Sequence, residues 1–294
     1  MKITVSLRRI HEWFGGEIAP AVEVVQRAEE AGIDQVSVVD HILMGEDVSA
    51  YPYGKFTFDL SVPWWEPVTL LAALASATKR IRLSTSVIVS PLRPAVFLAK
   101  QLSTLDHLSG GRLDAGLGVG WQKAEYDSSG VAWENRFAQM EEQIRACKLL
   151  WTEAPATFHG RYTSFSRIYQ RPFPLQSGGI PIWLGVSDSD RSLVRVAELA
   201  DGWCPPANDI EKLVAALEKL RHAFDERGRD PQSLKTRVVL PIVMGSNGPD
   251  LEASVAHIPR YEKIGVTMME ITPAIFCRGL SDLDGFLETV KARI

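Results

Sequence analysis

The chain has 294 residues, enough for one large domain or two medium ones, and its hydrophobic fraction of 46 % is ordinary for a packed globular protein. Its 32 Lys and Arg against 36 Asp and Glu give a net charge of −4, which argues against the basic face of a nucleic-acid-binding protein. Three widely spaced cysteines without a CxxC pair argue against a zinc site and a disulfide framework. No membrane helix or signal peptide is recognisable, so we expect a cytoplasmic protein with no membrane partner.

Strand-like apolar runs alternate with helical patterns along the whole chain. In chain order, the expected strand and helix pairs are 3–7 with 19–31, 35–39 with 65–78, 81–89 with 94–108, 112–117 with 133–151, 181–186 with 190–200, 202–204 with 209–227, 236–243 with 250–264, and 267–271 with 281–294. Residues 42–63 form a long loop, and residues 155–179 lack a helical period, with a small hairpin expected around Gly160.

Eight such units predict an α/β protein built on a parallel sheet that helices cover. A closed (β/α)₈ TIM barrel needs eight βα units in about 250 to 300 residues, and an open doubly wound sheet is the alternative. No break in composition divides the chain, so we expect one domain over residues 1–294. The barrel would carry a long loop after strand 2 and an insertion between helix 4 and strand 5.

Candidate catalytic residues follow the second predicted strand. In a (β/α)₈ barrel the active site lies at the carboxyl ends of the strands, where this sequence places Asp40 and His41. An imidazole can take up or release a proton near neutral pH, and Asp40 would orient it or cap the loop. A histidine that only hydrogen-bonds a loop is the alternative. Trp13, Trp64 and Trp121 lie in or near loops at the same end, where aromatic rings enclose a flat ligand or pack as a lid.

Glycines alternate at the end of the fourth strand, at positions 116, 118 and 120. Their G-x-G-x-G spacing differs from the dinucleotide fingerprint, and no helical pattern begins before about residue 133. The missing side chains indicate a planar ring against this strand end, with a tight corner of the barrel as the alternative.

Gly185, Val186 and Ser187 precede a predicted helix, whose first N–H groups attract phosphate. A plain strand–turn–helix junction is the alternative there, and the neighbouring aspartates would repel an anion unless they point away as caps.

Five blocks of the sequence resemble the luciferase-like monooxygenase superfamily, most strongly over residues 36–204. They are VSVVDH (36–41), IRLSTSVIVSPLRPAVFLAKQLSTLDHLSGGRLDAGLGVGW (81–121), AEYDSSGV (124–131), LLWTEAPATFHGRYTSF (149–165) and PIWLGVSDSDRSLVRVAELADGW (181–203). The resemblance implies a TIM barrel that binds reduced FMN or the deazaflavin coenzyme F420. Asp40-His41, Pro52-Tyr53-Gly54, Pro63-Trp64 and PLRPAVFLAK resemble the F420-dependent branch more closely.

The resemblance also implies site residues. The Asp40-His41 pair would lie beside the deazaflavin, with His41 as acid or base, and a non-prolyl cis peptide at Ser86-Val87 would back the ring. Contacts to the ring edge and the coenzyme phosphate would come from Gly118, Val119, Gly120, Gly185, Val186 and Ser187. Trp121 stands where F420-dependent glucose-6-phosphate dehydrogenases carry a glutamate, which argues against a sugar-phosphate substrate.

We therefore expect an F420-dependent oxidoreductase that transfers a hydride between the deazaflavin and a small organic substrate, with no metal. The first alternative is an FMN-dependent monooxygenase supplied with reduced flavin by a separate reductase. A non-catalytic cofactor-binding protein on the same barrel and a sugar-processing barrel are further alternatives, although Asp40 and Asp201 are the only carboxylates suited to the latter. The resemblance implies a homodimer or homotetramer.

Overall fold

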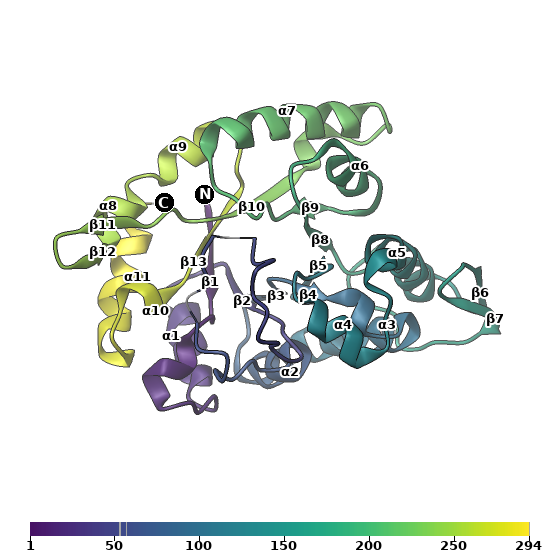
Figure 1. Ribbon diagram of the computed structural model, residues 1–294, viewed down its shortest axis with the longest axis horizontal. Coiled ribbons are helices and arrows are strands. Elements are labelled where there is room, and N and C mark those ends of the chain that lie inside the picture. The colour runs from purple at the N-terminus through teal and green to yellow at the C-terminus, as the bar shows by residue number, and fades with distance from the viewer. Residues whose placement is uncertain (53, 57, 294) are drawn as a thin grey trace.

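A parallel sheet of nine strands, in the order β3-β2-β1-β13-β10-β9-β8-β5-β4, forms the centre of the molecule. In this computed structural model, which describes residues 1–52, 54–56 and 58–293, β3 also pairs with β5 and so closes the sheet into a barrel (Figure 1). Strands β3 and β4 are two halves of one predicted strand, so the barrel has eight strand positions. The (β/α)₈ prediction is confirmed; Tyr53 of the Pro52-Tyr53-Gly54 stretch lies outside the described residues.

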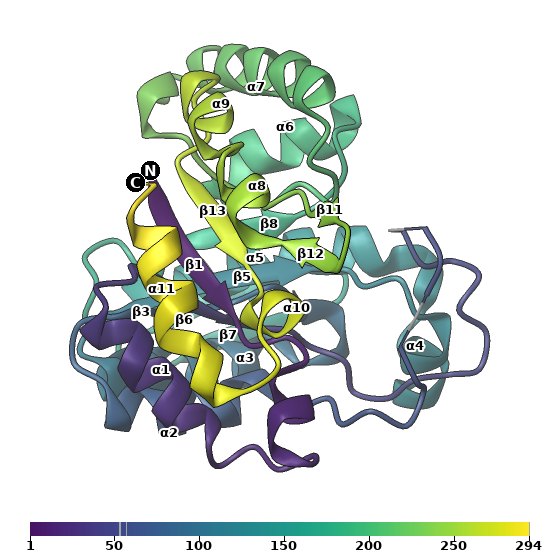
Figure 2. The ribbon, with the colours of Figure 1, turned by 90° about the vertical axis from the view of Figure 1, so that its left-hand side faces the viewer.

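The barrel strands are β1 (Lys2–Ser6), β2 (Gln35–Val38), β3 (Arg82–Thr85), β4 (Ile88–Val89), β5 (Leu113–Gly118), β8 (Ile182–Gly185), β9 (Gly202–Trp203), β10 (Lys235–Val239) and β13 (Met268–Ile271). The longer helices around them are α1 (Ala21–Glu30), α2 (Pro67–Ala77), α3 (Ala95–Ser109), α5 (Arg136–Thr152), α6 (Asp190–Leu199), α7 (Ile210–Asp225) and α11 (Leu283–Lys291). Helix α11 packs beside α1, so the end of the chain completes the ring of helices (Figure 2).

Local sequence explains why these helices form where they do. Helix α1 buries Ala21, Val24, Val25 and Ala28, whose spacing places them on one face of a helix. Helix α2 begins with Pro67, whose missing N–H costs nothing in the first turn.

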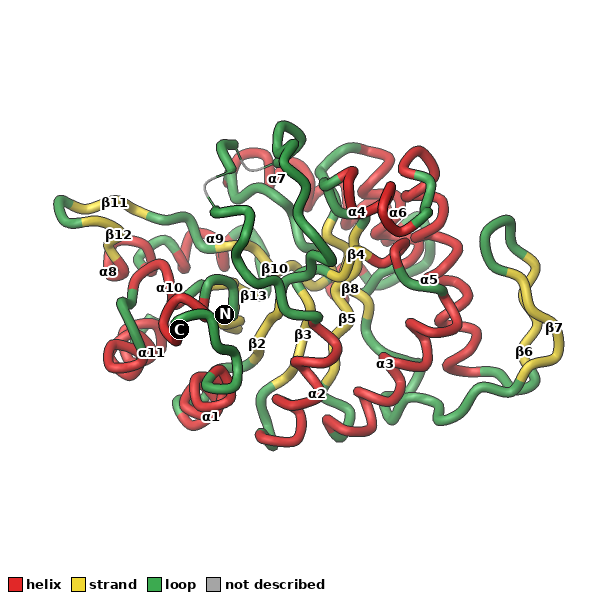
Figure 3. The backbone as a smooth tube through the Cα atoms, turned by 60° about the horizontal axis from the view of Figure 1, so that its bottom comes forward, coloured by secondary structure: helices red, strands yellow, loops and turns green. Residues whose placement is uncertain are grey.

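The two excursions from the barrel follow the prediction. The loop between β2 and α2 runs across the end of the barrel (Figure 3). The insertion before β8 contains an antiparallel hairpin of β6 (Ala156–His159) and β7 (Ser164–Ile168), which projects from the side of the molecule (Figure 1). Glu142 of α5 accepts hydrogen bonds from the N–H groups of Arg161, Tyr162 and Thr163, which fastens the hairpin turn to the barrel helix.

Two of the expected helical regions are different in the structure. Helix α4 (Lys123–Ser129) begins soon after the glycines, where we expected no helix before about residue 133. The expected helix over 250–264 is two short helices, α8 (Leu251–Val255) and α9 (Ile258–Lys263), and Pro259 in the first turn of α9 has no N–H to continue α8.

The segments that follow the seventh and eighth barrel strands also differ from the prediction. The seventh strand ends at Val239 rather than at 243, because Pro241 cannot donate to a strand ladder; the hairpin of β11 (Val243–Gly245) and β12 (Gly248–Asp250) follows. A short helix, α10 (Pro273–Phe276), lies between β13 and α11.

A polar network fills the barrel where many such barrels carry layers of branched apolar side chains. Arg237 of β10 donates to Gln35 Oε1 at 2.8 Å and to Ser84 Oγ at 2.9 Å. Gln35 in turn donates to Asp114 at 2.7 Å, and Asp114 pairs with Arg82 at 2.7 Å. Each buried charge therefore has a partner, as burial in a low-dielectric interior requires.

The glycines of β5 allow the strand to run tightly against the third strand. A Cβ on Gly116 would lie 2.0 Å from the carbonyl oxygen of Thr85, and one on Gly118 would lie 2.6 Å from Cγ2 of Val87. Gly120 has a positive φ of 65° and faces Val89 in the same way. Close packing of the barrel wall, the alternative to a stacked ring, therefore accounts for the missing side chains.

We expect Gly116→Ala to lower the free energy of unfolding by about 3 kcal/mol or more, because its methyl group meets backbone that cannot move aside. Gly285→Ala is the control: this exposed position in α11 has open space for a Cβ, so the change should stabilise the protein by about 0.5–1 kcal/mol. Equilibrium unfolding in urea measures both. Equal stability of the two variants would contradict the tight contact between β5 and the third strand.

Candidate functional site

His41 lies at the carboxyl end of β2, on the rim where barrel enzymes carry their active sites. Its Nδ1 is 3.3 Å from Oε2 of Glu125, a residue of α4 whose side chain is 0 % exposed. The other oxygen of Glu125 accepts from the N–H of Ile42 at 2.7 Å. A single buried carboxylate thus holds both the imidazole ring and the backbone that follows it.

Sequence reasoning missed Glu125. The residue belongs to the AEYDSSGV block, but a glutamate in a stretch without a clear helical pattern carries no sign of burial. The closed barrel brings α4 beside the end of β2, 84 residues earlier in the chain. The role of Glu125 is therefore visible only in the folded barrel, where its side chain is fully buried.

Aromatic rings surround His41 and leave its side chain 12 % exposed. The ring centroids of Trp64 and Trp121 lie 4.7 Å and 5.6 Å from that of His41, both edge-on. Tyr51 and Phe56 pack on Trp121, at 5.1 Å and 5.6 Å. Two of the three predicted pocket tryptophans therefore meet at the histidine.

The third tryptophan, Trp13, lies elsewhere. It belongs to the short helix η1 (Ile10–Phe14) and packs on Phe14 at 6.3 Å. The sequence correctly predicted that Trp13 follows β1, but the direction of its side chain could not be predicted.

The hydrogen-bond partners of Asp40 do not include His41, which we expected it to orient. Its carboxylate accepts from the N–H of Val89 at 2.9 Å and forms a two-pronged ion pair with Arg93, at 2.6 Å and 3.0 Å. Burial lowers the pKa of Arg93, but Asp40 and Glu66 outweigh this effect and raise it. Asp40 therefore joins the end of β2 to β4 and to the start of α3, while Glu125 orients His41.

Ser86 and Val87 are joined by the cis peptide that the resemblance implied. Ser86 donates to the carboxylate of Glu270 at 3.0 Å, and Glu270 lies 3.1 Å from Nε of Arg237. Cys204 lies beside the same arginine, and burial raises the pKa of its thiol to about 11, so the thiol is protonated at neutral pH. These polar groups lie inside the barrel below the rim.

The remaining predicted cofactor positions form the barrel wall beside Val87. A Cβ on Gly118 or on Gly185 would collide with the Val87 side chain, at 2.6 Å and 2.9 Å. Val119 and Val186 are buried, and their carbonyl groups accept from the Tyr126 hydroxyl and the Trp203 indole N–H, respectively. The structure therefore brings Gly118 and Gly185 together beside Val87, whereas Gly120 faces Val89.

Ser187 lies at the start of α6 in a cluster of hydroxyl groups. Its Oγ is 3.2 Å from Oγ of Ser189 and 3.2 Å from Oγ of Ser192. Asp190, which would repel an anion, instead pairs with Lys219 of α7 at 2.8 Å. The carboxylate of Asp190 is thus engaged by a cation on a neighbouring helix.

Among residues 1–52, 54–56 and 58–293, no group of three or more His, Cys, Asp or Glu side chains has a geometry that would hold a metal ion. None of the helices in these ranges is long and apolar enough to span a bilayer.

Replacing Asp40 by Asn should lower the free energy of unfolding by about 3 kcal/mol, because Arg93 would then be buried with half of its charge partners removed. Glu66→Gln is the matched control, since that carboxylate binds the same guanidinium but is 41 % exposed; we expect a loss of about 1 kcal/mol. Denaturant unfolding distinguishes the two variants. A loss at Asp40 no larger than that at Glu66 would contradict the anchoring role.

The comparisons with known proteins agree with this architecture. The family model of luciferase-like monooxygenases matches residues 6–292. An F420-dependent glucose-6-phosphate dehydrogenase of Amycolatopsis mediterranei is 35 % identical over 161 residues, which cover 51 % of this chain and 44 % of that protein. An FMNH₂-dependent dimethylsulfone monooxygenase of Pseudomonas putida is 32 % identical over 159 residues, covering 53 % and 43 %.

A solved structure shares the fold over the whole length. An F420-dependent secondary alcohol dehydrogenase, in complex with an F420–acetone adduct, superposes with a TM-score of 0.78 at 17 % identity, covering 100 % of this chain and 99 % of that one. Because the family model spans nearly the entire barrel, the chain belongs to the luciferase-like monooxygenase family.

Proposed function

We propose that this protein is an F420-dependent oxidoreductase that transfers a hydride between the deazaflavin and a small organic substrate. The observation that carries the proposal is His41, held on the barrel rim by a buried carboxylate and walled by Trp64 and Trp121. The similarity to an F420-dependent dehydrogenase over half of the chain supports this choice of cofactor.

When bound, the deazaflavin supplies the hydride, and the protein must supply the proton that accompanies it. The Nδ1 of His41 is engaged by Glu125, which leaves Nε2 as the nitrogen that can exchange a proton with the substrate. A carboxylate behind an imidazole fixes the orientation of the ring. His41 is thus the proposed acid or base, and Glu125 its positioning residue.

The chain's own residues offer two places for the cofactor. One is the barrel wall where Gly118 and Gly185 pack against Val87, at the ends of β5 and β8. The hydroxyls of Ser187 and Ser192 lie at the N-terminus of α6, where backbone N–H groups favour an anion such as the coenzyme phosphate. The engagement of Asp190 by Lys219 supports this assignment.

Access to His41 requires rearrangement of the aromatic rings. Tyr51 and Phe56, on the long loop after β2, lie against Trp121. A tricyclic ring can reach the imidazole only when these rings separate from Trp121, so the loop is proposed to act as the lid of the site.

The second candidate is an FMN-dependent monooxygenase that receives reduced flavin from a separate reductase. The similarity to the dimethylsulfone monooxygenase favours it, because that relative covers as much of this chain as the F420-dependent one. The homodimer or homotetramer implied by the resemblance and the cytoplasmic location stay predictions under either candidate.

Cofactor choice can be tested by equilibrium titration of the protein with F420 and with FMN, each oxidised and reduced, followed through cofactor fluorescence. We expect F420 to bind at least about tenfold more tightly than FMN, a difference of about 1.4 kcal/mol. Tighter binding of FMN would favour the monooxygenase, and no uptake of either cofactor would refute both candidates.

The roles of His41 and Glu125 can be separated by steady-state kinetics. We expect His41→Ala to lower kcat by about 10²–10⁴-fold with little change in cofactor affinity, because it removes the proton carrier. Glu125→Gln keeps a hydrogen-bonding group but removes the charge, so a smaller fall, about tenfold, is expected. Equal losses in kcat and cofactor affinity at His41 would assign it to binding instead.

A further inference from the structure

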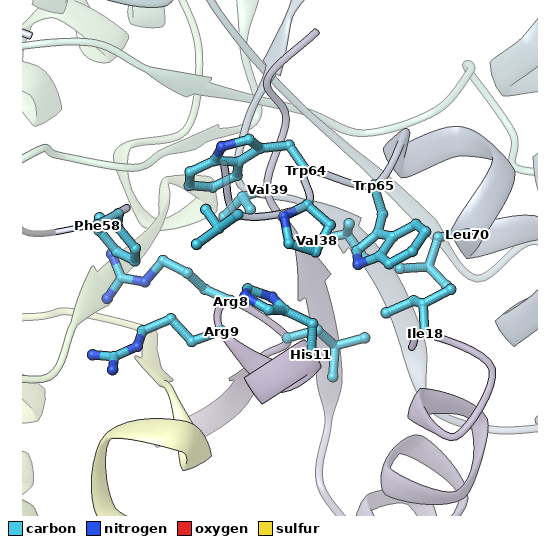
Figure 4. Close-up of a pocket in the computed structure, with 13 residues that line it drawn as sticks. Arg8, Arg9, His11, Ile18, Val38, Val39, Phe58, Trp64, Trp65 and Leu70 are labelled. Atoms are coloured by element: carbon cyan, nitrogen blue, oxygen red, sulfur yellow. The ribbon is translucent and has the colours of Figure 1, made fainter. Parts of the chain in front are cut away.

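A small pocket lies on the barrel rim beside the candidate active site. The end of β1 and the helix η1 form one side, with Arg8, Arg9 and His11, and the long loop after β2 forms the other, with Trp64 and Trp65 (Figure 4). The volume of about 20 Å³ accommodates roughly one water molecule, or one polar atom of a ligand. The remaining lining is apolar, so any polar group that enters is shielded from solvent.

The pocket contains hydrogen-bond donors that have no acceptor. Nε of Arg8 and the indole N–H groups of Trp64 and Trp65 are buried and have no hydrogen-bond partner among the residues that the structure describes. All three residues line this pocket, and none of the described lining residues is acidic. A buried hydrogen-bond donor without a partner costs free energy. A ligand that supplies hydrogen-bond acceptor atoms would therefore bind favourably in this pocket.

The charge in the pocket is also uncompensated. Arg9 is paired with Glu12 through two hydrogen bonds, at 2.7 Å and 3.0 Å. Within the described ranges of the chain, no carboxylate forms an ion pair with Arg8, although the residue is partly buried among apolar side chains. One positive charge therefore remains available to a ligand.

The pocket adjoins the proposed catalytic residue. Trp64 forms part of its lining and also contacts the ring of His41, with centroids 4.7 Å apart. Phe58 lines the pocket and packs on Trp64 at 5.8 Å. A ligand bound at Arg8 is therefore separated from the imidazole of His41 by the indole ring of Trp64, and it contacts the aromatic side chains that line the pocket.

We infer that this pocket binds the carboxylate of a small substrate that has an apolar body. One oxygen of a carboxylate fits this volume, accepts from the buried Nε of Arg8, and brings a single negative charge to a single unpaired cation. A phosphate dianion would need a second cation, and Glu12 already neutralises Arg9. Only the identification of this ligand as the substrate rests on the proposed function; the binding itself requires no cofactor.

The test uses the full-length protein without cofactor and matched pairs of probes, benzoate with benzamide and hexanoate with hexanamide. Tryptophan fluorescence reports binding, because Trp64 and Trp65 line the pocket. We expect each carboxylate to bind at least about tenfold more tightly than its neutral amide. Arg8→Gln should abolish that preference and Arg8→Lys should retain part of it. Arg9→Gln, the control at a paired arginine, should change carboxylate affinity much less.

Thermal unfolding separates a ligand-binding role of Arg8 from a structural one, because loss of a structural arginine would lower the melting temperature. Without ligand, Arg8→Gln should leave the melting temperature unchanged or raise it, because it removes a partly buried charge that has no partner. Equal binding of carboxylates and amides, no saturable binding of either, or unchanged carboxylate affinity in Arg8→Gln would each overturn the inference. Binding of F420 in the same preparation would leave the proposed function standing in any of these cases.

Discussion

The candidate site depends on the close contact between β5 and the broken third strand, which closes the barrel. Gly116 lies so near the carbonyl of Thr85 that no larger residue fits there without displacing backbone. Because the sheet closes at this contact, the end of β2 and the start of α4 share one rim. His41 and Glu125, distant in sequence, become neighbours as a consequence of that closure.

Buried charges pair with one another through the barrel and at its rim. Asp40 with Arg93 and Asp114 with Arg82 both tie one strand to the next segment of chain around the barrel. Such pairs contribute little net stability over apolar packing, since desolvation offsets most of their attraction, but removing one member leaves a costly unpaired charge. They therefore specify the arrangement of the strands. Arg8 is the contrast: it lies in a largely apolar pocket, and no carboxylate in the described part of the chain pairs with it.

Much of the architecture was predictable because strand and helix patterns are local properties of the sequence. The eight βα units, the long second loop and the hairpin insertion all follow from residues near each other in the chain. His41, Trp64 and Trp121 could be placed on one rim because the loops that follow the strands of a (β/α)₈ barrel all lie at the same end. The contacts of Asp40 could not be read from the sequence, because adjacency in sequence does not determine contact: its carboxylate accepts from the N–H of Val89 and pairs with Arg93. Glu125 and the unpaired donors around Arg8 emerge only from tertiary packing.

We propose that the imidazole of His41 faces the reactive face of a bound deazaflavin. A crystal structure of the protein soaked with F420 tests it most directly. We expect the deazaflavin ring on the barrel rim, connected to Nε2 of His41 by hydrogen bonds through a substrate or water, with Tyr51 and Phe56 displaced from Trp121. A ring bound elsewhere, or His41 turned away from the ring with its contact to Glu125 lost, would contradict it.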